Sequence, residues 1–199
     1  MIVSCDEHGM GAAAEVLLGG GVAVIPTDTV YGLAAHPDFP EAVARLYDIK
    51  HRQAGKPIAL LASGADAVAR AGFQLSGEAA HLAAAYWPGG LTMVVSNEER
   101  TEGFRVPDHE WTRRLIEKCG GLLRVTSANL SGGMDATDAQ TALGGVGLTA
   151  DIVVDGGRSP GGVPSTVVKV SPDGSVAILR QGAVNGKIWY NINNRERTL

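Results

Sequence analysis

Cysteine is scarce in this chain of 199 residues, which contains two, Cys5 and Cys119. They show no metal-ligand spacing and form no disulfide framework. Long apolar runs are also missing, since none approaches the roughly 18 residues that a membrane-spanning helix needs. The amino terminus lacks the charged start and the apolar stretch of a secretory signal. We therefore expect a cytoplasmic protein that contacts no membrane and holds no metal through its own side chains.

Aromatic residues and positive charge are also limited, at 5% and a formal net charge of −4. This balance argues against a general nucleic-acid coat, although a local basic cleft remains open. The length suits one large domain or two tight ones and can bury a full core without disulfides. The 27 glycines indicate tight turns and close backbone approaches.

Several familiar sequence motifs are absent. The chain has no G-x-x-x-x-G-K-[ST] phosphate loop, no G-x-S-x-G elbow and no H-E-x-x-H pair. Residues 145–150 fit a relaxed G-x-G-x-x-A pattern, but they follow a predicted helix and precede a predicted strand, the reverse of a dinucleotide site. The five histidines are scattered, so we expect surface or core histidines rather than metal ligands or bases.

The apolar periodicity predicts alternating strands and helices early in the chain and a run of strands late. Thr137 begins a capping-box pattern and is the predicted N-cap of a short helix, residues 97–102 are a predicted loop, and Ser76 is another predicted N-cap. This order favours a single-domain α/β fold, residues 1–199, with a mixed sheet, a core at about 11–183 and a peripheral tail at 184–199. Predicted helices cover 11–18, 40–49, 65–71, 76–86 and 111–118, and predicted strands cover 22–26, 58–61, 91–95, 104–107, 122–125, 152–155, 166–170 and 176–179.

Two polar runs follow buried strands and point to a ligand site. The first is PTDTVYGL at 26–33, with cations after it at Lys50, Arg52 and Lys56, and the second is TSANLSG at 126–132. Loops at the carboxyl ends of strands are where open α/β sheets bind ligands. The cations suit a polyphosphate and the uncharged donors suit a nucleoside. Either run alone would be an ordinary polar turn, but the two together predict a site.

Two pairs of residues within these runs carry the predicted chemistry. Lys50 and Arg52 stand at the end of a helix, where both can reach one anion, although cations are favoured at any helix carboxyl end. Ser127 and Asn129 follow a strand two positions apart, so they point to one side. The alternative for this second pair is a local turn closed by their own side chains.

Arg105 is a guanidinium within the apolar segment FRVP at 104–107. A cation placed there is costly unless it binds an anion. The anion can be a ligand carboxylate or one of the chain's own 21 acidic side chains. The residues alone leave these two alternatives open.

Taken in order, these segments resemble the threonylcarbamoyl-AMP synthases, which have the YrdC-like fold. The resemblance extends from about residue 11 to residue 183 and implies a twisted mixed sheet flanked by helices around a concave, positively charged cleft. The chain is similar to the short, single-domain form of the family. The segments that carry the resemblance are 26–33, Lys50-x-Arg52 with Lys56-Pro57, WPGGLT at 87–92, FRVP at 104–107, SANLSG at 127–132, PSTVV at 164–168 and LRQGA at 179–183.

The resemblance implies an enzyme, a nucleotidyltransferase that makes threonylcarbamoyl-AMP and pyrophosphate from L-threonine, bicarbonate and ATP. Mg²⁺ is expected to accompany ATP on chemical grounds. The implied downstream partners are the proteins that transfer threonylcarbamoyl to tRNA adenosine. Direct binding of tRNA or double-stranded RNA is a further partner to consider.

The resemblance also assigns roles to individual residues. Tyr31 and Thr27 are expected to wall the cleft, although a core tyrosine is an equally good interpretation of Tyr31. The implied catalytic residues are Lys50, Arg52, Ser127 and Asn129; the implied ATP-binding residues are Arg52, Lys56, Thr101, Asn129, Thr137 and Arg180; the implied threonine-binding residues are Thr29, Arg105, Ser127 and Ser165.

Two positions depart from the family pattern. Gln53 stands where a proline commonly follows the Lys-x-Arg pair, and Leu61 stands where several relatives have a histidine that helps hold threonine. We therefore expect modest affinity for threonine and a detectable reaction with serine.

Two other functions remain as alternatives. One is an RNA-binding or ribosome-assembly accessory protein that uses the same concave face, which the net charge and the few aromatics disfavour. The other is an enzyme that makes a different carbamoyl adenylate, as the YrdC-like module does within larger carbamoyltransferases. This chain shows neither an acylphosphatase-like segment nor zinc-finger cysteines, which disfavours the second alternative.

Overall fold

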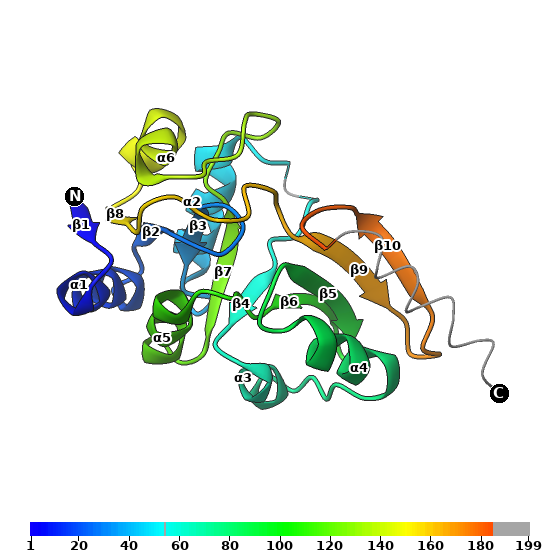
Figure 1. The fold of residues 1–199 in the computed structure, drawn as a ribbon. Helices are drawn as coiled ribbons and strands as arrows, with labels where there is room; N and C mark the ends of the chain where they lie inside the picture. The colour runs from blue at the N-terminus through cyan, green and yellow to red at the C-terminus, as the bar shows by residue number, and fades with distance from the viewer. Residues whose placement is uncertain (54, 185–199) are drawn as a thin grey trace.

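The computed structural model describes residues 1–53 and 55–184, and residues 185–199 of the predicted peripheral tail lie outside this part of the chain. Ten strands form one sheet in the order β1-β8-β2-β3-β7-β4-β6-β5-β9-β10 (Figure 1). The strands are β1 (Ile2–Ser4), β2 (Val22–Ile25), β3 (Gly32–Ala35), β4 (Leu60–Ala62), β5 (Leu91–Ser96), β6 (Thr101–Arg105), β7 (Leu122–Ser127), β8 (Ile152–Asp155), β9 (Thr166–Val170) and β10 (Val176–Arg180). The helices are α1 (Glu7–Leu18), α2 (Pro40–Lys50), α3 (Ala65–Arg70), α4 (Gly77–Tyr86), α5 (Glu110–Lys118), α6 (Ala139–Gly145) and the short 3₁₀ helix η1 (Gly147–Thr149).

The sheet is mixed, which confirms the predicted fold class. β8 is parallel to β1 and β2, β4 is parallel to β6, and β5 is parallel to β9. The remaining neighbours are antiparallel, including the hairpin of β2 and β3. No helix of the described residues is both long and apolar enough to cross a membrane.

The sequence prediction missed or misplaced several elements. β1 and β3 were not predicted, because β1 has only three residues and β3 begins inside the first polar run, at Gly32. α1 begins four residues earlier than predicted, since the Asp6 side chain accepts a hydrogen bond from the Gly9 amide. β6 begins at Thr101, inside the predicted loop 97–102.

The predicted N-cap of α6 is wrong by one residue. Asp138, not Thr137, caps this helix by accepting hydrogen bonds from the Thr141 amide and hydroxyl at 2.7 and 2.6 Å. A carboxylate is as good an N-cap as a hydroxyl, so the sequence could not show which of the two adjacent residues caps the helix. Ser76 does stand at the N-cap position of α4, but its side chain makes no capping hydrogen bond.

Helices cover both faces of the half of the sheet that contains β8, β2 and β3. In Figure 1, α1 and α5 lie below these strands and α2 and α6 lie above them. The period of two along β2 explains this sandwich, because Ala23 and Ile25 pack with α1 and α5 while Val22 and Val24 pack with α2 and α6. Every residue of β2 is therefore buried.

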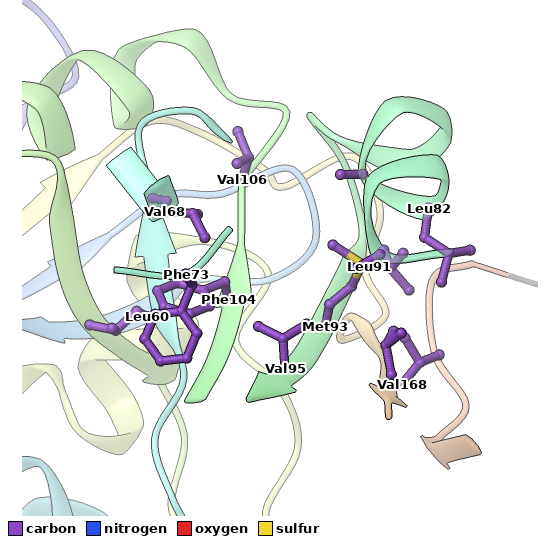
Figure 2. Packing of buried hydrophobic residues seen from close by; sticks show 14 of the residues in the cluster. Leu60, Val68, Phe73, Leu82, Leu91, Met93, Val95, Phe104, Val106 and Val168 are labelled. Atoms are coloured by element: carbon purple, nitrogen blue, oxygen red, sulfur yellow. The ribbon is translucent and has the colours of Figure 1, made fainter. Parts of the chain in front are cut away.

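The half of the sheet built from β4, β6, β5 and β9 has a different environment on each face. One face packs against α3 and α4 in a core that includes the edge-to-face pair Phe73 and Phe104, with ring centroids 4.8 Å apart (Figure 2). Along β5, the strand alternates between Leu91, Met93 and Val95 in this core and Thr92 and Val94 on the other face. That other face forms the floor of a cavity.

Candidate active site

A cavity of about 600 Å³ opens over β4, β5, β6 and β9, and it collects residues from both polar runs. The runs meet because β3 lies between β2 and β7, and the Ala128 amide donates to the Tyr31 carbonyl at 2.8 Å. Lys50, Asn129 and Thr137 lie outside the cavity lining. The sequence-predicted residues that line it are Thr27, Thr29, Tyr31, Arg52, Lys56, Thr101, Arg105, Ser127, Ser165 and Arg180.

The first polar run forms a tight turn at residues 27–30. The Thr27 hydroxyl donates to the Val30 carbonyl at 2.7 Å and accepts from the Thr29 amide at 3.2 Å. The Gly161 amide donates to the Asp28 carbonyl at 3.0 Å. A Cβ atom on residue 161 would lie 2.7 Å from that carbonyl oxygen, so this close packing requires glycine. The turn is thus held by its own side chains and by the loop before β9.

Arg105 is buried at the end of β6, with an exposed fraction of 6%. Its guanidinium forms an ion pair with Asp28 and donates to the Thr29 hydroxyl at 2.8 Å and the Gly89 carbonyl at 2.9 Å. Burial lowers the pKa of Arg105, and Asp28 opposes this shift. The structural ion pair left open by the sequence is therefore present, and Arg105 lines the cavity as well.

Lys50 and Arg52 take different directions at the end of α2. His51 between them has φ 50°, a left-handed conformation that ends the helix. Lys50 turns inward and donates to the carbonyls of Ser127 and Asn129, the first at 2.5 Å. Arg52 lines the cavity while its guanidinium donates to the carbonyls of Lys56 and, at 3.1 Å, Pro57. The two cations therefore point to different places, Lys50 to the segment after β7 and Arg52 to the cavity.

The segment after β7 is closed around the Lys50 ammonium. The Ser127 hydroxyl donates to the Asn129 side-chain oxygen at 2.6 Å, and Lys50 donates to that oxygen at 3.1 Å. The Asn129 amide group donates to the Gly133 carbonyl at 2.8 Å. Burial lowers the pKa of Lys50 to about 8, with Arg52 adding to this shift and Asp135 opposing it. Ser127 and Asn129 do not point together into the cavity as the sequence predicted, because Ser127 lines it while Asn129 is 9% exposed and turned toward Lys50. Their direct hydrogen bond is the local contact given as the alternative.

Arg180 and Ser165 form the side of the cavity next to β9 and β10. The Arg180 guanidinium donates to the Ser165 carbonyl at 2.9 Å and to the Ser165 hydroxyl at 3.2 Å. Burial lowers the pKa of Arg180. The Ser165 hydroxyl also lies 2.8 Å from the hydroxyl of Thr92, a buried residue that lines the cavity. Thr92 was not among the predicted site residues, although a hydroxyl within the apolar alternation of β5 was a usable signal.

Two carboxylates were also missed by the sequence prediction. Asp28 lies within the first polar run, but only tertiary structure shows that it pairs with Arg105. Glu102 lines the cavity and accepts hydrogen bonds from both terminal nitrogens of Arg124, at 2.7 and 2.6 Å. Each carboxylate is thus paired with an arginine of the sheet, Asp28 with the buried Arg105 and Glu102 with the half-buried Arg124.

The remaining predicted residues differ in their surroundings. Tyr31 is fully buried, and its hydroxyl donates to the Gly157 carbonyl at 2.7 Å, while burial raises the pKa of the phenol to about 12. It is therefore a core tyrosine that also contributes to the cavity lining. Thr101 is exposed at the mouth, with its hydroxyl 2.7 Å from that of Ser96. Thr137 contributes its carbonyl to the Ser159 amide at 2.7 Å.

Leu61 lies next to Arg105 in the register of β4 and β6 and lines the cavity. It gives an apolar surface beside the guanidinium. Among residues 1–53 and 55–184, no three His, Cys, Asp or Glu side chains are grouped as metal ligands.

A protein-family model with the description "Telomere recombination" matches residues 15–182 of this chain. The chain belongs to the Sua5/YciO/YrdC family. This membership confirms the predicted resemblance. A relative of the family from Mycobacterium leprae is 32% identical over 188 residues, which cover 89% of this chain and 84% of that protein.

A second relative, from Pyrococcus abyssi, is named threonylcarbamoyl-AMP synthase and is 30% identical over 189 residues. These residues cover 90% of this chain but 55% of that protein, so the chain spans about half its length. A solved structure of P. abyssi Sua5 complexed with L-threonine has a TM-score of 0.89 and 28% identity, covering 97% of this chain and 61% of that one. The Sua5/YciO/YrdC fold is thereby confirmed for nearly the whole chain.

Proposed function

We propose that this chain is an L-threonylcarbamoyladenylate synthase, which uses L-threonine, bicarbonate and ATP. The observation that carries the proposal is the composition of the cavity. Its cations Arg52, Lys56 and Arg180 suit a polyphosphate, and a smaller buried region around Thr29 and Arg105 suits an amino acid. The names of the relatives and the threonine-bound P. abyssi structure support the same reaction.

The proposed reaction has two bond-forming steps. The threonine amine attacks the carbon of bicarbonate, and loss of water gives a carbamate. An oxygen of that carbamate then attacks the α-phosphorus of ATP, and the bond to pyrophosphate breaks. The protein needs to hold the reactants in line, neutralise the leaving phosphates and exclude water, without covalent participation.

The cavity offers groups for each of these tasks. Arg52 has part of its guanidinium committed to two backbone carbonyls, so its plane is already oriented for a phosphate oxygen. Lys56 and Arg180 supply further positive charge in the cavity lining. Lys50 acts through the segment that it holds, because its ammonium is committed to the carbonyls of Ser127 and Asn129. Mg²⁺ would be carried mainly by the phosphate oxygens of ATP itself.

The amino acid is assigned to the region of Thr29, Arg105, Ser127 and Ser165. Arg105 has three of its five N–H groups on protein acceptors, which leaves the fork able to meet a carboxylate. Its charge is already balanced by Asp28, so this region attracts a zwitterion less strongly than an unpaired arginine would. Modest threonine affinity follows from this balance as well as from the apolar Leu61.

The product carries a mixed anhydride between a carbamate and AMP, which a tRNA-directed threonylcarbamoyl transferase would consume. We place the reaction in the cytoplasm and keep direct binding of tRNA or double-stranded RNA as a secondary feature of the proposal. The net charge of −4 gives no support to RNA binding as the main function.

The test of the proposal is pyrophosphate release from ATP. We expect release that requires both bicarbonate and L-threonine, with each omitted in turn and each of the other amino acids substituted for threonine. Release that is independent of bicarbonate, or that follows another amino acid better than threonine, would contradict the proposed function. The Arg52→Ala variant serves as a control for activity from a contaminating enzyme.

A further inference from the structure

We propose that the Thr29 hydroxyl can only accept a hydrogen bond from the amino-acid substrate, and that Thr27 is the positioning residue that enforces this. The inference rests on the proposed function and deepens it. It assigns a hydrogen-bond donor of the substrate, either its amine or its side-chain hydroxyl, to the Thr29 oxygen. Substrate carboxylate oxygens are excluded from that position.

The first step is the proton of Thr27. A hydroxyl has one proton to donate, and the Thr27 hydroxyl donates it to the Val30 carbonyl at 2.7 Å. The hydroxyl oxygens of Thr27 and Thr29 lie 3.1 Å apart. Since the proton of Thr27 is already committed, Thr29 must be the donor in this contact. The single proton of Thr29 therefore points at Thr27 and away from any ligand.

The second step concerns Arg105, which lies on the other side of Thr29. Its Nη1 donates to the Thr29 oxygen at 2.8 Å, and a guanidinium has no acceptor atom. The ion pair with Asp28 and the hydrogen bond to the Gly89 carbonyl fix the guanidinium in this orientation. One lone pair of the Thr29 oxygen is thus occupied and one is left. Because Thr29 lines the cavity, that lone pair is the part a substrate meets.

The third step is the rigidity of the turn. The amides of Gly161 and Gly162 donate to the carbonyls of Asp28 and Thr29 at 3.0 and 2.8 Å. Thr27 and Thr29 are both buried, each with an exposed fraction of 2%. The order of donors, from Arg105 through Thr29 and Thr27 to a backbone carbonyl, is therefore set by packing before any substrate binds.

The experiment measures the affinity of L-threonine and of ATP by calorimetry in the wild type, Thr27→Val and Thr27→Ser. Valine keeps the shape of threonine but removes the acceptor of the Thr29 hydroxyl. That O–H can then rotate toward the cavity, where it would face the substrate's own donor. We expect Thr27→Val to weaken L-threonine binding about tenfold and to leave ATP affinity within about twofold. Thr27→Ser keeps the donor chain and should bind L-threonine within about twofold of the wild type.

Thr112→Val is the matched control. Thr112 is fully buried, and its hydroxyl donates to the carbonyl of Pro26 at 2.7 Å, one residue before Thr27. It does not line the cavity. This variant therefore makes the same chemical change beside the same turn, and it should lower the melting temperature without changing L-threonine affinity.

Two analogues identify the donor. O-methyl-L-threonine keeps the side-chain oxygen but lacks its proton, and (R)-3-hydroxybutanoate lacks the amine and has no other donor in its place. The analogue whose loss of affinity disappears in a Thr29→Val background has lost the group that contacts Thr29. If neither loss disappears in that background, the inference is overturned.

The inference would also be overturned if Thr27→Val bound L-threonine as tightly as the wild type does. It would equally be overturned if Thr112→Val or Thr27→Ser lost as much L-threonine affinity as Thr27→Val. Either result would leave the proposed function intact. If the wild type binds no L-threonine and releases no pyrophosphate, the proposed function fails, and the inference fails with it.

Discussion

The ammonium of Lys50, the last residue of α2, lies 3.1 Å from the side-chain oxygen of Asn129, 79 positions later in the chain. Lys50 also donates to two backbone carbonyls of the same segment, so a buried cation fixes the residues that follow β7. Arg52, two positions beyond Lys50, lines the cavity instead. The two cations of the Lys-x-Arg pair therefore have different tasks, one in shaping the site and one in meeting the ligand.

Substituting these two residues should separate the tasks. Arg52→Ala should lower adenylate formation on the order of 100-fold and leave the melting temperature almost unchanged, because a charge-assisted contact to phosphate is lost. Lys50→Met should lower activity as strongly and also lower the melting temperature, because the carbonyls of Ser127 and Asn129 lose a donor at a cost of about 1–3 kcal/mol. Activity assays and thermal melts of both variants check this. Equal melting temperatures would show that Lys50 does not hold this segment.

The lowered pKa of Lys50 predicts a dependence of activity on pH. Its burial brings the pKa to about 8 from an ordinary 10.5, so the ammonium loses a proton as the pH rises through about 8. We expect ATP-dependent activity to fall over that range, because the neutral amine holds the carbonyls less strongly.

Stability should change in the opposite direction over the same range. The unfolded lysine still binds its proton between about pH 8 and 10.5, so the free energy of unfolding gains from this group as the pH rises. A fall in activity without a fall in melting temperature is therefore the expected pattern. In Lys50→Arg the side chain stays protonated, so the activity of this variant should not fall as the pH rises through about 8. If its pH profile matched that of the wild type, the fall in activity would come from the titration of another group.

The broad architecture could be predicted because strong apolar periodicity marks the strands and helices that fill the core. The two polar runs could also be placed in one site, since each follows a buried strand. The different directions of Lys50 and Arg52 could not be predicted, because they depend on the left-handed conformation of His51 between them. The role of Asp28 could not be predicted either, because its partner Arg105 lies 77 positions away in the chain.

The ion pair with Asp28 also changes what Arg105→Lys should do. An ammonium cannot reproduce the three differently directed hydrogen bonds of the guanidinium. We expect the KM for threonine to rise about tenfold, the KM for ATP to stay within about twofold, and the melting temperature to fall as well. Kinetics with each substrate varied in turn, together with melts, measure all three quantities.

Arg45→Lys is the control for the loss of an arginine fork elsewhere. Arg45 binds both oxygens of Asp151, at 2.8 and 3.1 Å, and does not line the cavity. Its replacement should leave both KM values unchanged. If the KM for threonine in Arg105→Lys stayed at the wild-type value, Arg105 would have only the structural role of pairing with Asp28.

Serine should be a poor but measurable substrate. Leu61 gives the cavity an apolar surface, and the loss of one methyl contact lowers kcat/KM by roughly 10- to 200-fold. Pyrophosphate release with serine at high enzyme concentration measures this ratio. Complete rejection of serine would mean that the site reads the threonine methyl group through a contact that the structure does not reveal.

The most direct test of the central claim is the product itself. The wild-type enzyme should be incubated with ATP, L-threonine and ¹³C-labelled bicarbonate, and the mixture should be resolved by mass spectrometry. The account predicts an adenylate with the mass of threonylcarbamoyl-AMP that carries the ¹³C label and is lost in Arg52→Ala. Threonyl-AMP, which lacks the bicarbonate carbon, would contradict it. So would AMP and pyrophosphate with no labelled adenylate, under conditions in which the product is stable.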